Sequence, residues 1–259
     1  MNMKIKILSL AFLLFAAGCN KDLPVDNNDE NNNPISGYKL ELIKEHPMDV
    51  KEPSGLSWDL KHQNLLTVSD NTNKAYSVDT QGKTLHTFIY EGDDTEGITI
   101  DEKNGNYWIA EEAKSQLVKL DSTGIELQRY YINVNPSSKK KGLEGLSYDD
   151  ESKIFYILNE AEPGLLVKWS LTKGIISKKE LSFASDYSGI YYDKDLKSLW
   201  IVSDQSRKLF LCNTDGVVKQ SFALTYEKAE GVVADVKSQR LFIVSDSEQK
   251  LYEYKITEL

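Results

Sequence analysis

Hydrophobic and polar positions alternate in short runs along most of the chain, and a period of two is typical of half-buried β-strands. Residues 64–69, 74–78 and 83–90 are three such runs, and residues 79–82, Asp-Thr-Gln-Gly, separate the last two. An Asp at the start and a Gly at the end of such a segment favour a β-turn, because Gly accepts a positive φ. The pattern therefore predicts an all-β chain of short strands joined by tight turns.

Five segments of the chain repeat one pattern at fixed offsets from a glycine. These glycines stand 42 to 48 residues apart: Gly55, Gly97, Gly145, Gly189 and Gly231. Four positions after each glycine there is an Asp: Asp59, Asp101, Asp149, Asp193 and Asp235. Fifteen positions after each glycine there is a carboxylate: Asp70, Glu112, Glu160, Asp204 and Asp246. A repeat of about 40–50 residues with four short strands is the pattern of a β-propeller blade, so we predict five blades.

The last repeat has room for only three strands before the chain reaches Leu259. Residues 38–42, Tyr-Lys-Leu-Glu-Leu, alternate apolar and polar positions and are a candidate for the missing fourth strand. Pairing of this segment with residues 251–256 would close the ring and remove exposed strand edges. We therefore predict a five-bladed β-propeller domain over residues 37–259, closed by an N-terminal strand.

The first residues differ from the repeats, because they combine a basic start, an apolar run over residues 7–17 and small residues before Cys19. The apolar run is too short to cross a bilayer as a helix, and the order of these features is that of a secretory signal peptide. The sequence Phe-Ala-Ala-Gly-Cys resembles a bacterial lipobox, which implies cleavage after residue 18 and lipidation of Cys19. We therefore predict a lipoprotein signal peptide over residues 1–18, with an ordinary secretory peptide as the alternative.

A lipidated chain would be held in the bacterial cell envelope. We expect it on the outer membrane, and the sequence does not distinguish the periplasmic side from the cell surface. Residues 19–36 follow the cleavage site and are rich in Asn and Asp without an apolar period, which predicts the acylated Cys followed by a disordered tether. The formal net charge of -9 argues against a nucleic-acid partner, since phosphates are bound by clustered Lys and Arg. Cys212 lies in an apolar run, and we expect it to be buried and unpaired.

Strand geometry predicts where the repeated carboxylates lie. The residue before each glycine starts the first strand of a blade, and the carboxylate fifteen positions after the glycine ends the second strand, so both belong to one face. The residues before the glycines form the expected ring at the channel mouth: Ser54, Glu96, Glu144, Ser188 and Glu230. We expect Asp70, Glu112, Glu160, Asp204 and Asp246 to form an outer acidic ring, and the Asp residues four positions after the glycines to cap turns.

Like charges at such short range raise one another's pKa or require a cation. Three carboxylates and two hydroxyls around one axis suit a hard divalent cation, and Ca²⁺ is the expected cofactor. A structural interpretation competes with this one, because a Lys stands four positions after three of the outer acids: Lys74, Lys208 and Lys250. Ion pairs between these lysines and Asp70, Asp204 and Asp246 would neutralise much of the outer ring.

The repeats at residues 96–112, 144–160 and 230–246, which read EGITID…YWIAEE, EGLSYD…FYILNE and EGVVAD…LFIVSD, resemble the SdiA-regulated, YjiK-like family of envelope propellers. The resemblance implies a propeller in the bacterial envelope and supplies no established reaction. Calcium-dependent lactonase propellers and phytase-like domains are similar in architecture, and they motivate an enzymatic alternative.

Three classes of function remain open at this point. We favour a membrane-anchored binding or scaffold module without catalytic residues, whose acidic mouth takes a divalent cation, a cationic ligand, or a metal-bridged ligand or protein partner. The alternative is a calcium-dependent hydrolase acting at the channel mouth, and the third class is a purely structural envelope component. The sequence contains no G-x-S-x-G nucleophile motif, and we expect His46, His62 and His86 to lie away from the channel.

Overall fold

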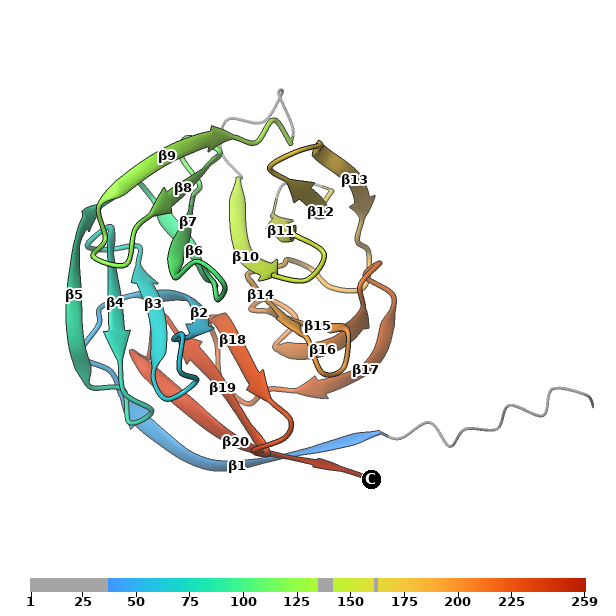
Figure 1. The fold of residues 1–259 in the computed structure, drawn as a ribbon. Coiled ribbons are helices and arrows are strands. Elements are labelled where there is room, and N and C mark those ends of the chain that lie inside the picture. Colours follow the sequence, from blue (N-terminus) through green and yellow to red (C-terminus); the bar gives the residue numbers. More distant parts are fainter. Residues whose placement is uncertain (1–36, 135–141, 161–162) are drawn as a thin grey trace, which may run out of the picture. The chain divides into compact units, whose positions relative to one another are not determined.

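The computed structural model describes residues 37–134, 142–160 and 163–259, and these residues form strands and connecting segments only. Twenty strands make five antiparallel four-stranded sheets arranged around a common axis (Figure 1). The predicted all-β, five-bladed propeller is therefore confirmed. The predicted signal peptide and tether lie outside the described residues. Within the described ranges there is no helix, and so none that is long and apolar enough to span a membrane.

Each blade orders its strands from the axis to the rim. The first blade contains β2 (Pro53–Trp58), β3 (Leu65–Ser69), β4 (Lys74–Val78) and β5 (Thr84–Glu91). The second contains β6 (Thr95–Asp101), β7 (Asn106–Glu111), β8 (Gln116–Leu120) and β9 (Glu126–Tyr131). The third contains β10 (Leu143–Asp149), β11 (Ile154–Asn159), β12 (Leu165–Ser170) and β13 (Gly174–Glu180). The fourth contains β14 (Gly189–Asp193), β15 (Ser198–Ser203), β16 (Lys208–Asn213) and β17 (Val218–Ala223).

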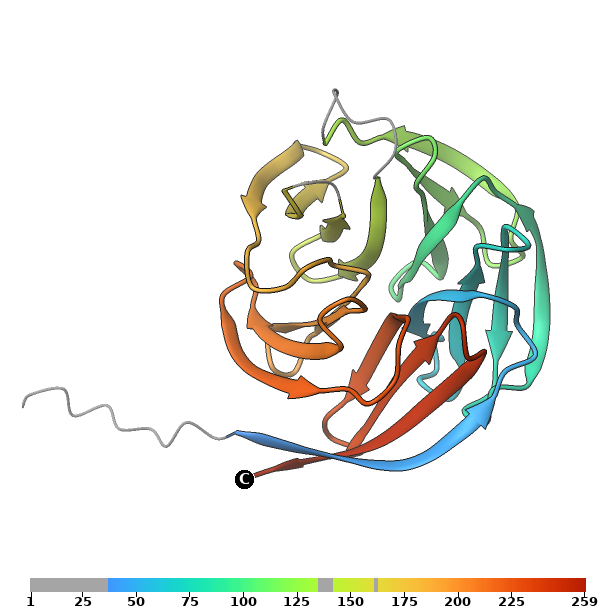
Figure 2. The ribbon, with the colours of Figure 1, turned by 180° about the vertical axis from the view of Figure 1, so that it is seen from behind.

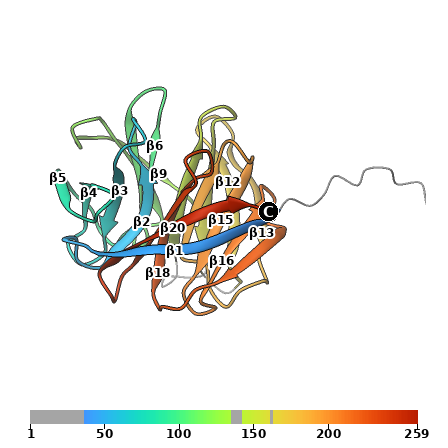
Figure 3. The ribbon, with the colours of Figure 1, turned by 90° about the horizontal axis from the view of Figure 1, so that it is seen from below.

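The fifth blade is built from both ends of the described chain. It contains β18 (Ala229–Asp235), β19 (Arg240–Ser245), β20 (Lys250–Glu258) and, at the rim, β1 (Tyr38–Pro47). β1 and β20 pair antiparallel, with Leu40 opposite Ile256 and His46 opposite Leu251. Figures 2 and 3 show the two strands side by side along the outside of this blade. The predicted closure of the ring by the N-terminal strand is confirmed.

The hydrophobic core lies between neighbouring blades. Trp108 of the second blade packs edge-on against Phe155 of the third at a ring-centroid distance of 4.7 Å, and Trp169 joins the same cluster. Tyr38 of the closing strand packs edge-on against Trp200 of the fourth blade at 6.3 Å. Because the apolar face of one blade is covered by the next, the stability of each blade depends on an intact ring.

The repeated glycines mark the places where first strands of adjacent blades approach most closely. A Cβ on Gly97 would lie 2.8 Å from Leu146 Cβ, and a Cβ on Gly145 would lie 2.9 Å from Ile190 Cγ2. A Cβ on Gly55, whose φ is +54°, would lie 2.7 Å from the carbonyl oxygen of Glu96. The glycine recurs because these backbones meet with no space for a side chain.

The Asp four positions after each glycine caps a turn at the face opposite the predicted acidic ring. In every blade a backbone N–H of the following turn donates to this carboxylate at 2.9–3.2 Å. The predicted capping role of these five residues is confirmed. The predicted turn over residues 79–82 is also present, with Gly82 N–H donating to the Asp79 carbonyl at 3.0 Å and a φ of +84° at Gly82.

Candidate functional site

A cavity of about 180 Å³ opens on the axis, at the face where the first strands begin. Two Ser residues, Gln205 and Lys228 line it together with nine carboxylates: Glu52, Asp70, Glu96, Glu144, Glu160, Asp186, Asp204, Glu230 and Asp246. Among these described lining residues Lys228 is the one basic side chain, so the fully ionised cavity would carry eight net negative charges. A charge of this density requires protons or cations.

The structure brings most of the residues singled out in the sequence into this cavity. All five members of the expected inner ring line it: Ser54, Glu96, Glu144, Ser188 and Glu230. Four of the five outer acids also line it, namely Asp70, Glu160, Asp204 and Asp246. Glu112 is not among the lining residues, and its Oε1 accepts a hydrogen bond from the backbone N–H of Gly142 at 2.7 Å.

The predicted ion pairs between outer acids and the lysines four positions later are wrong. Lys74 lies 3.6 Å from Glu91, its register partner on β5, rather than beside Asp70. Lys250 reaches Glu45 at 2.9 Å and Glu248 at 3.0 Å. Each of these lysines begins the third strand of its blade, where the rim strand offers a nearer acid than the channel does. The acids that face the channel are therefore not neutralised in the way we expected.

Asp204 confirms this point, because its cationic partner is Lys228 and not Lys208. Lys228 Nζ lies 3.4 Å from Asp204 Oδ2 and 3.7 Å from Glu230 Oε1. The backbone N–H of Lys228 also donates to Asp204 Oδ1 at 2.6 Å. The exposed fractions of the Asp204 and Glu230 side chains are 15% and 14%, so this ion pair is partly shielded from water.

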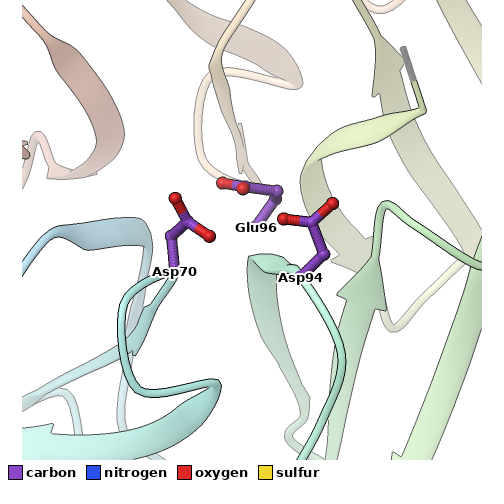
Figure 4. A group of neighbouring side chains, drawn as sticks. All are labelled: Asp70, Asp94 and Glu96. Atoms are coloured by element: carbon purple, nitrogen blue, oxygen red, sulfur yellow. The ribbon is translucent and has the colours of Figure 1, made fainter. Parts of the chain in front are cut away.

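Three carboxyl groups at the junction of the first two blades face a common space (Figure 4). Asp70 follows β3, Asp94 precedes β6 and Glu96 lies in β6, and one oxygen of each lies within 4.8 Å of the others. The backbone of Asp94 is held from both sides, since its N–H donates to Asn73 Oδ1 at 2.7 Å and its carbonyl accepts from Glu112 N–H at 2.8 Å. Oxygen ligands at this spacing can share one divalent cation.

Asp94 was missed in the sequence, although a signal was present there. It stands three positions before Gly97, and the same offset holds an acid in two other blades, at Glu52 and Asp186. The residues at this offset precede the first strand of each blade, and they are not acidic in every repeat: Gly142 and Lys228 stand there in the other two. The loop that carries Asp94 turns its side chain back toward the end of the preceding blade, which the strand pattern alone does not indicate.

Burial and mutual repulsion raise the pKa values of the cavity carboxyl groups. Burial raises the pKa of Glu96 well above its usual range, a hydrogen bond from Ser54 opposes this, and Asp70 adds to the rise. Burial also raises the pKa of Glu144, and the charge of Glu96 contributes. Burial raises the pKa of Glu230 to about 8, although Lys228 opposes the shift. These three carboxyl groups are therefore harder to ionise than free ones, and a bound cation would favour their ionised form.

Both serines of the inner ring hold neighbouring groups in place through hydrogen bonds. Ser54 Oγ lies 2.7 Å from Glu96 Oε2 and 2.9 Å from the Glu96 carbonyl oxygen, and it donates to this residue. Ser188 Oγ donates to the carbonyl oxygen of Ala229 at 3.0 Å and accepts from Asp204 N–H at 3.3 Å. Each hydroxyl therefore links its own blade to a residue of an adjacent one, at the height of the acidic cavity.

The remaining candidate groups have structural partners elsewhere. His46 hydrogen-bonds Glu253 at 3.0 Å, and His62 hydrogen-bonds Glu102 at 2.8 Å on the opposite face of the ring. Glu111 is fully buried and bonded to both Tyr90 and Arg129. Cys212 is buried with a free thiol, as predicted. None of the three described histidines lines the acidic cavity.

Solved structures with the same architecture include enzymes of different kinds. Glutaminyl cyclase from Myxococcus xanthus aligns at 10% identity with a TM-score of 0.66, covering 85% of this chain and 97% of its own. A gluconolactonase from Xanthomonas campestris aligns at 13% identity with a TM-score of 0.55, covering 84% of this chain and 99% of its own. At these identities the likeness concerns the fold alone. The family model SdiA-regulated matches residues 30–257, and the chain therefore belongs to the SdiA-regulated family.

Proposed function

We propose that this propeller is a binding module of the bacterial envelope whose acidic cavity holds one Ca²⁺ ion. The observation that carries the proposal is the group formed by Asp70, Asp94 and Glu96, with oxygens from two blades within 4.8 Å of one another. Ca²⁺ takes about 6–8 oxygen ligands in flexible geometry, so water would complete the shell. Glu144 lines the same cavity and would supply a further carboxylate from the third blade.

A bound ion would give the cavity two properties that suit recognition. Burial and, after it, repulsion raise the pKa values of Glu96 and Glu144, and a bound ion would oppose both effects and so hold adjacent blades together. It would also present exchangeable water positions to the open side of the cavity, where an oxygen of a ligand or of a protein partner can coordinate. The proposed partner therefore coordinates the bound metal ion through an oxygen atom. Alternatively, the partner is itself a cation that occupies the site in place of the metal ion.

Calcium should raise the melting temperature of the full chain, purified in detergent, relative to the same protein in chelator. A ligand at 100 times its Kd stabilises the folded state by about 2.7 kcal/mol, which corresponds to about 5–11 °C for a domain of this size. Asp94→Asn and Glu144→Gln should each reduce the shift, because each removes a carboxylate that the proposal assigns to the ion. The measurement is a thermal melt followed by circular dichroism, with Mg²⁺ as a second ion.

Glu41→Gln is the matched control, because the Glu41 side chain is exposed on β1 and forms none of the side-chain hydrogen bonds or ion pairs found among the described residues. Its calcium shift should equal that of the wild type. Equal melting temperatures of the wild type in calcium, magnesium and chelator would contradict the metal proposal, and the carboxylates would then serve structure or an organic cation.

A calcium-dependent hydrolase is the second candidate, and it is favoured by the largely buried carboxyl group of Glu230 in the cavity lining. The pKa of Glu230, near 8, would allow this carboxyl group to exchange a proton near neutral pH inside the cavity. Hydrolysis of a lactone or a phosphate ester that requires both calcium and Glu230 would support this candidate over a binding module.

The proposal also includes the lipid anchor at Cys19, which is supported by the small residues before it. Cys19→Ser should move the protein from the membrane fraction to the soluble envelope fraction, because acyl chains are the expected attachment. Fractionation followed by immunoblotting measures this distribution. Cys212→Ser is the control and should leave the distribution unchanged. A Cys19→Ser variant that stays with the membrane would show that something else attaches the chain.

A further inference from the structure

The position three residues before the repeated glycine has the same positive-φ backbone conformation in three blades, with different side chains. It is occupied in the five blades by Glu52, Asp94, Gly142, Asp186 and Lys228. Glu52, Asp94 and Lys228 have φ values of +43°, +60° and +56°. Their carbonyl oxygens accept hydrogen bonds from the backbone N–H groups of Asp70, Glu112 and Asp246 at 3.2, 2.8 and 3.0 Å. The loops that carry Glu52, Asp94 and Lys228 are therefore equivalent in structure, and the side chains of these three residues can be compared directly.

Each junction between adjacent blades joins three repeat positions on the acidic face of the propeller. They are the carboxylate that ends the second strand of one blade, and the residues three and one before the glycine of the next. At the junction of the first and second blades these are Asp70, Asp94 and Glu96. At the junction of the fourth and fifth blades they are Asp204, Lys228 and Glu230. The outer two positions are acidic in both junctions, and the middle one is Asp in the first and Lys in the second.

The Lys228 ammonium shows where a positive charge is held at such a junction. Its Nζ lies 3.4 Å from Asp204 Oδ2 and 3.7 Å from Glu230 Oε1, between the two carboxylates. Burial alone would lower the pKa of Lys228, but Glu230 and Asp204 raise it, so the ammonium keeps its charge. The protein thus supplies its own cation at the junction of the fourth and fifth blades.

The other three junctions contain two acids each. Between the fifth and first blades the three positions are Asp246, Glu52 and Ser54. Between the second and third they are Glu112, Gly142 and Glu144. Between the third and fourth they are Glu160, Asp186 and Ser188. At the second of these, Gly142 N–H donates to Glu112 at 2.7 Å and takes up part of its charge. The junction of the first two blades therefore has the most negative charge, and no Lys or Arg lies within ion-pair distance of its three acids among the described residues.

We infer that these two junctions are versions of one cation site, of which the Lys228 junction carries a built-in ammonium and the Asp94 junction takes a free divalent cation. This inference rests on the proposed function and adds a stoichiometry to it. The cavity binds one divalent cation, because Lys228 fills the second equivalent position. Lys228 is in this sense a specificity residue, which excludes a second metal ion from a cavity that has enough carboxylates for two.

Exchanging the side chains at the middle position should change the number of bound ions. Isothermal titration of CaCl₂ into the detergent-purified full chain should give one ion per wild-type chain and two per Lys228→Asp chain. Asp94→Lys should bind none, because an ammonium would replace the ion, and Asp94→Lys combined with Lys228→Asp should again bind one. Lys61→Asp makes the same charge change at an exposed site and should keep one ion.

The outcomes separate the inference from the proposed function. No calcium binding to the wild type refutes both. One ion bound by both the wild type and a folded Lys228→Asp leaves the calcium site intact and refutes the equivalence of the junctions. If Lys228→Asp does not fold, Asp94→Lys decides: in chelator it should melt at least as high as the wild type in chelator, with no further shift in calcium. A calcium shift retained by Asp94→Lys refutes the inference.

Discussion

Gly231→Ala should lower the free energy of unfolding by about 3 kcal/mol, the upper part of the usual range for overpacking a tight contact. The new methyl group would lie 2.6 Å from the carbonyl carbon of Gly55 and 2.8 Å from the backbone nitrogen of Leu56. Both atoms belong to the first strand of the neighbouring blade, so no side-chain rotation relieves the contact. For a domain of this size the loss corresponds to a fall in melting temperature of about 6–12 °C, measured by circular dichroism.

Gly105→Ala is the matched control for this substitution. A Cβ at Gly105 has no atom within 4 Å, but its φ of +69° is unfavourable for Ala. This control should cost about 1 kcal/mol from backbone strain alone. If Gly231→Ala melts within about 2 °C of Gly105→Ala, the close approach of first strands around the axis does not limit stability.

The close approach of first strands also brings the acidic residues of the cavity together. A Cβ on Gly55 would contact the carbonyl oxygen of Glu96, and one on Gly97 would lie 3.1 Å from that of Glu144. The glycine of one blade thus rests against the ring residue of the next. The repeat that stabilises the fold therefore also places glutamates from three blades around one axis, and their charges must be balanced by other groups.

The architecture could be predicted because it depends on local patterns that recur. Strand limits such as Lys74–Val78 follow from alternation, and the turn at residues 79–82 follows from an Asp and a Gly at set positions. The closing strand could be predicted because the last repeat has only three strands, and the segment before the first repeat has the alternation of a fourth. Each of these features is encoded within a few residues and confirmed by its recurrence in other blades.

The candidate metal site could be predicted only in part, because it depends on which blades meet. Glu96 and Asp70 follow from their offsets from the glycines, whereas Asp94 precedes β6 in a loop, where strand alternation does not indicate the direction of a side chain. The lysines at positions 74 and 250 were assigned to the wrong acids, since the rim strands that hold Glu91 and Glu45 compete for them. Distances between side chains of different strands decide such pairings, and sequence offsets do not give those distances.

Removal of residues 20–49 should abolish cooperative unfolding, whereas removal of residues 20–36 should leave the melt unchanged. The longer deletion takes away β1, and with it Tyr38 and Met48, which are 8% and 7% exposed. Burial of one such side chain contributes about 1.5–3 kcal/mol, and a whole domain is stable by only about 5–15 kcal/mol. The deletion also exposes the edge of β20 and removes the hydrogen bond between His46 and Glu253.

The two deletions are compared by thermal melts and by urea titration of the full chain and of each variant. The shorter deletion tests whether the segment predicted to be a tether adds stability, and it controls for the change in length. The loss of β1 also removes two hydrogen bonds between the Gln220 side chain on β17 and the Tyr38 backbone, at 2.8 and 2.6 Å. The fourth blade therefore loses contacts to the fifth as well. Sharp transitions with the same midpoint in both variants would mean that the ring closes without its N-terminal strand.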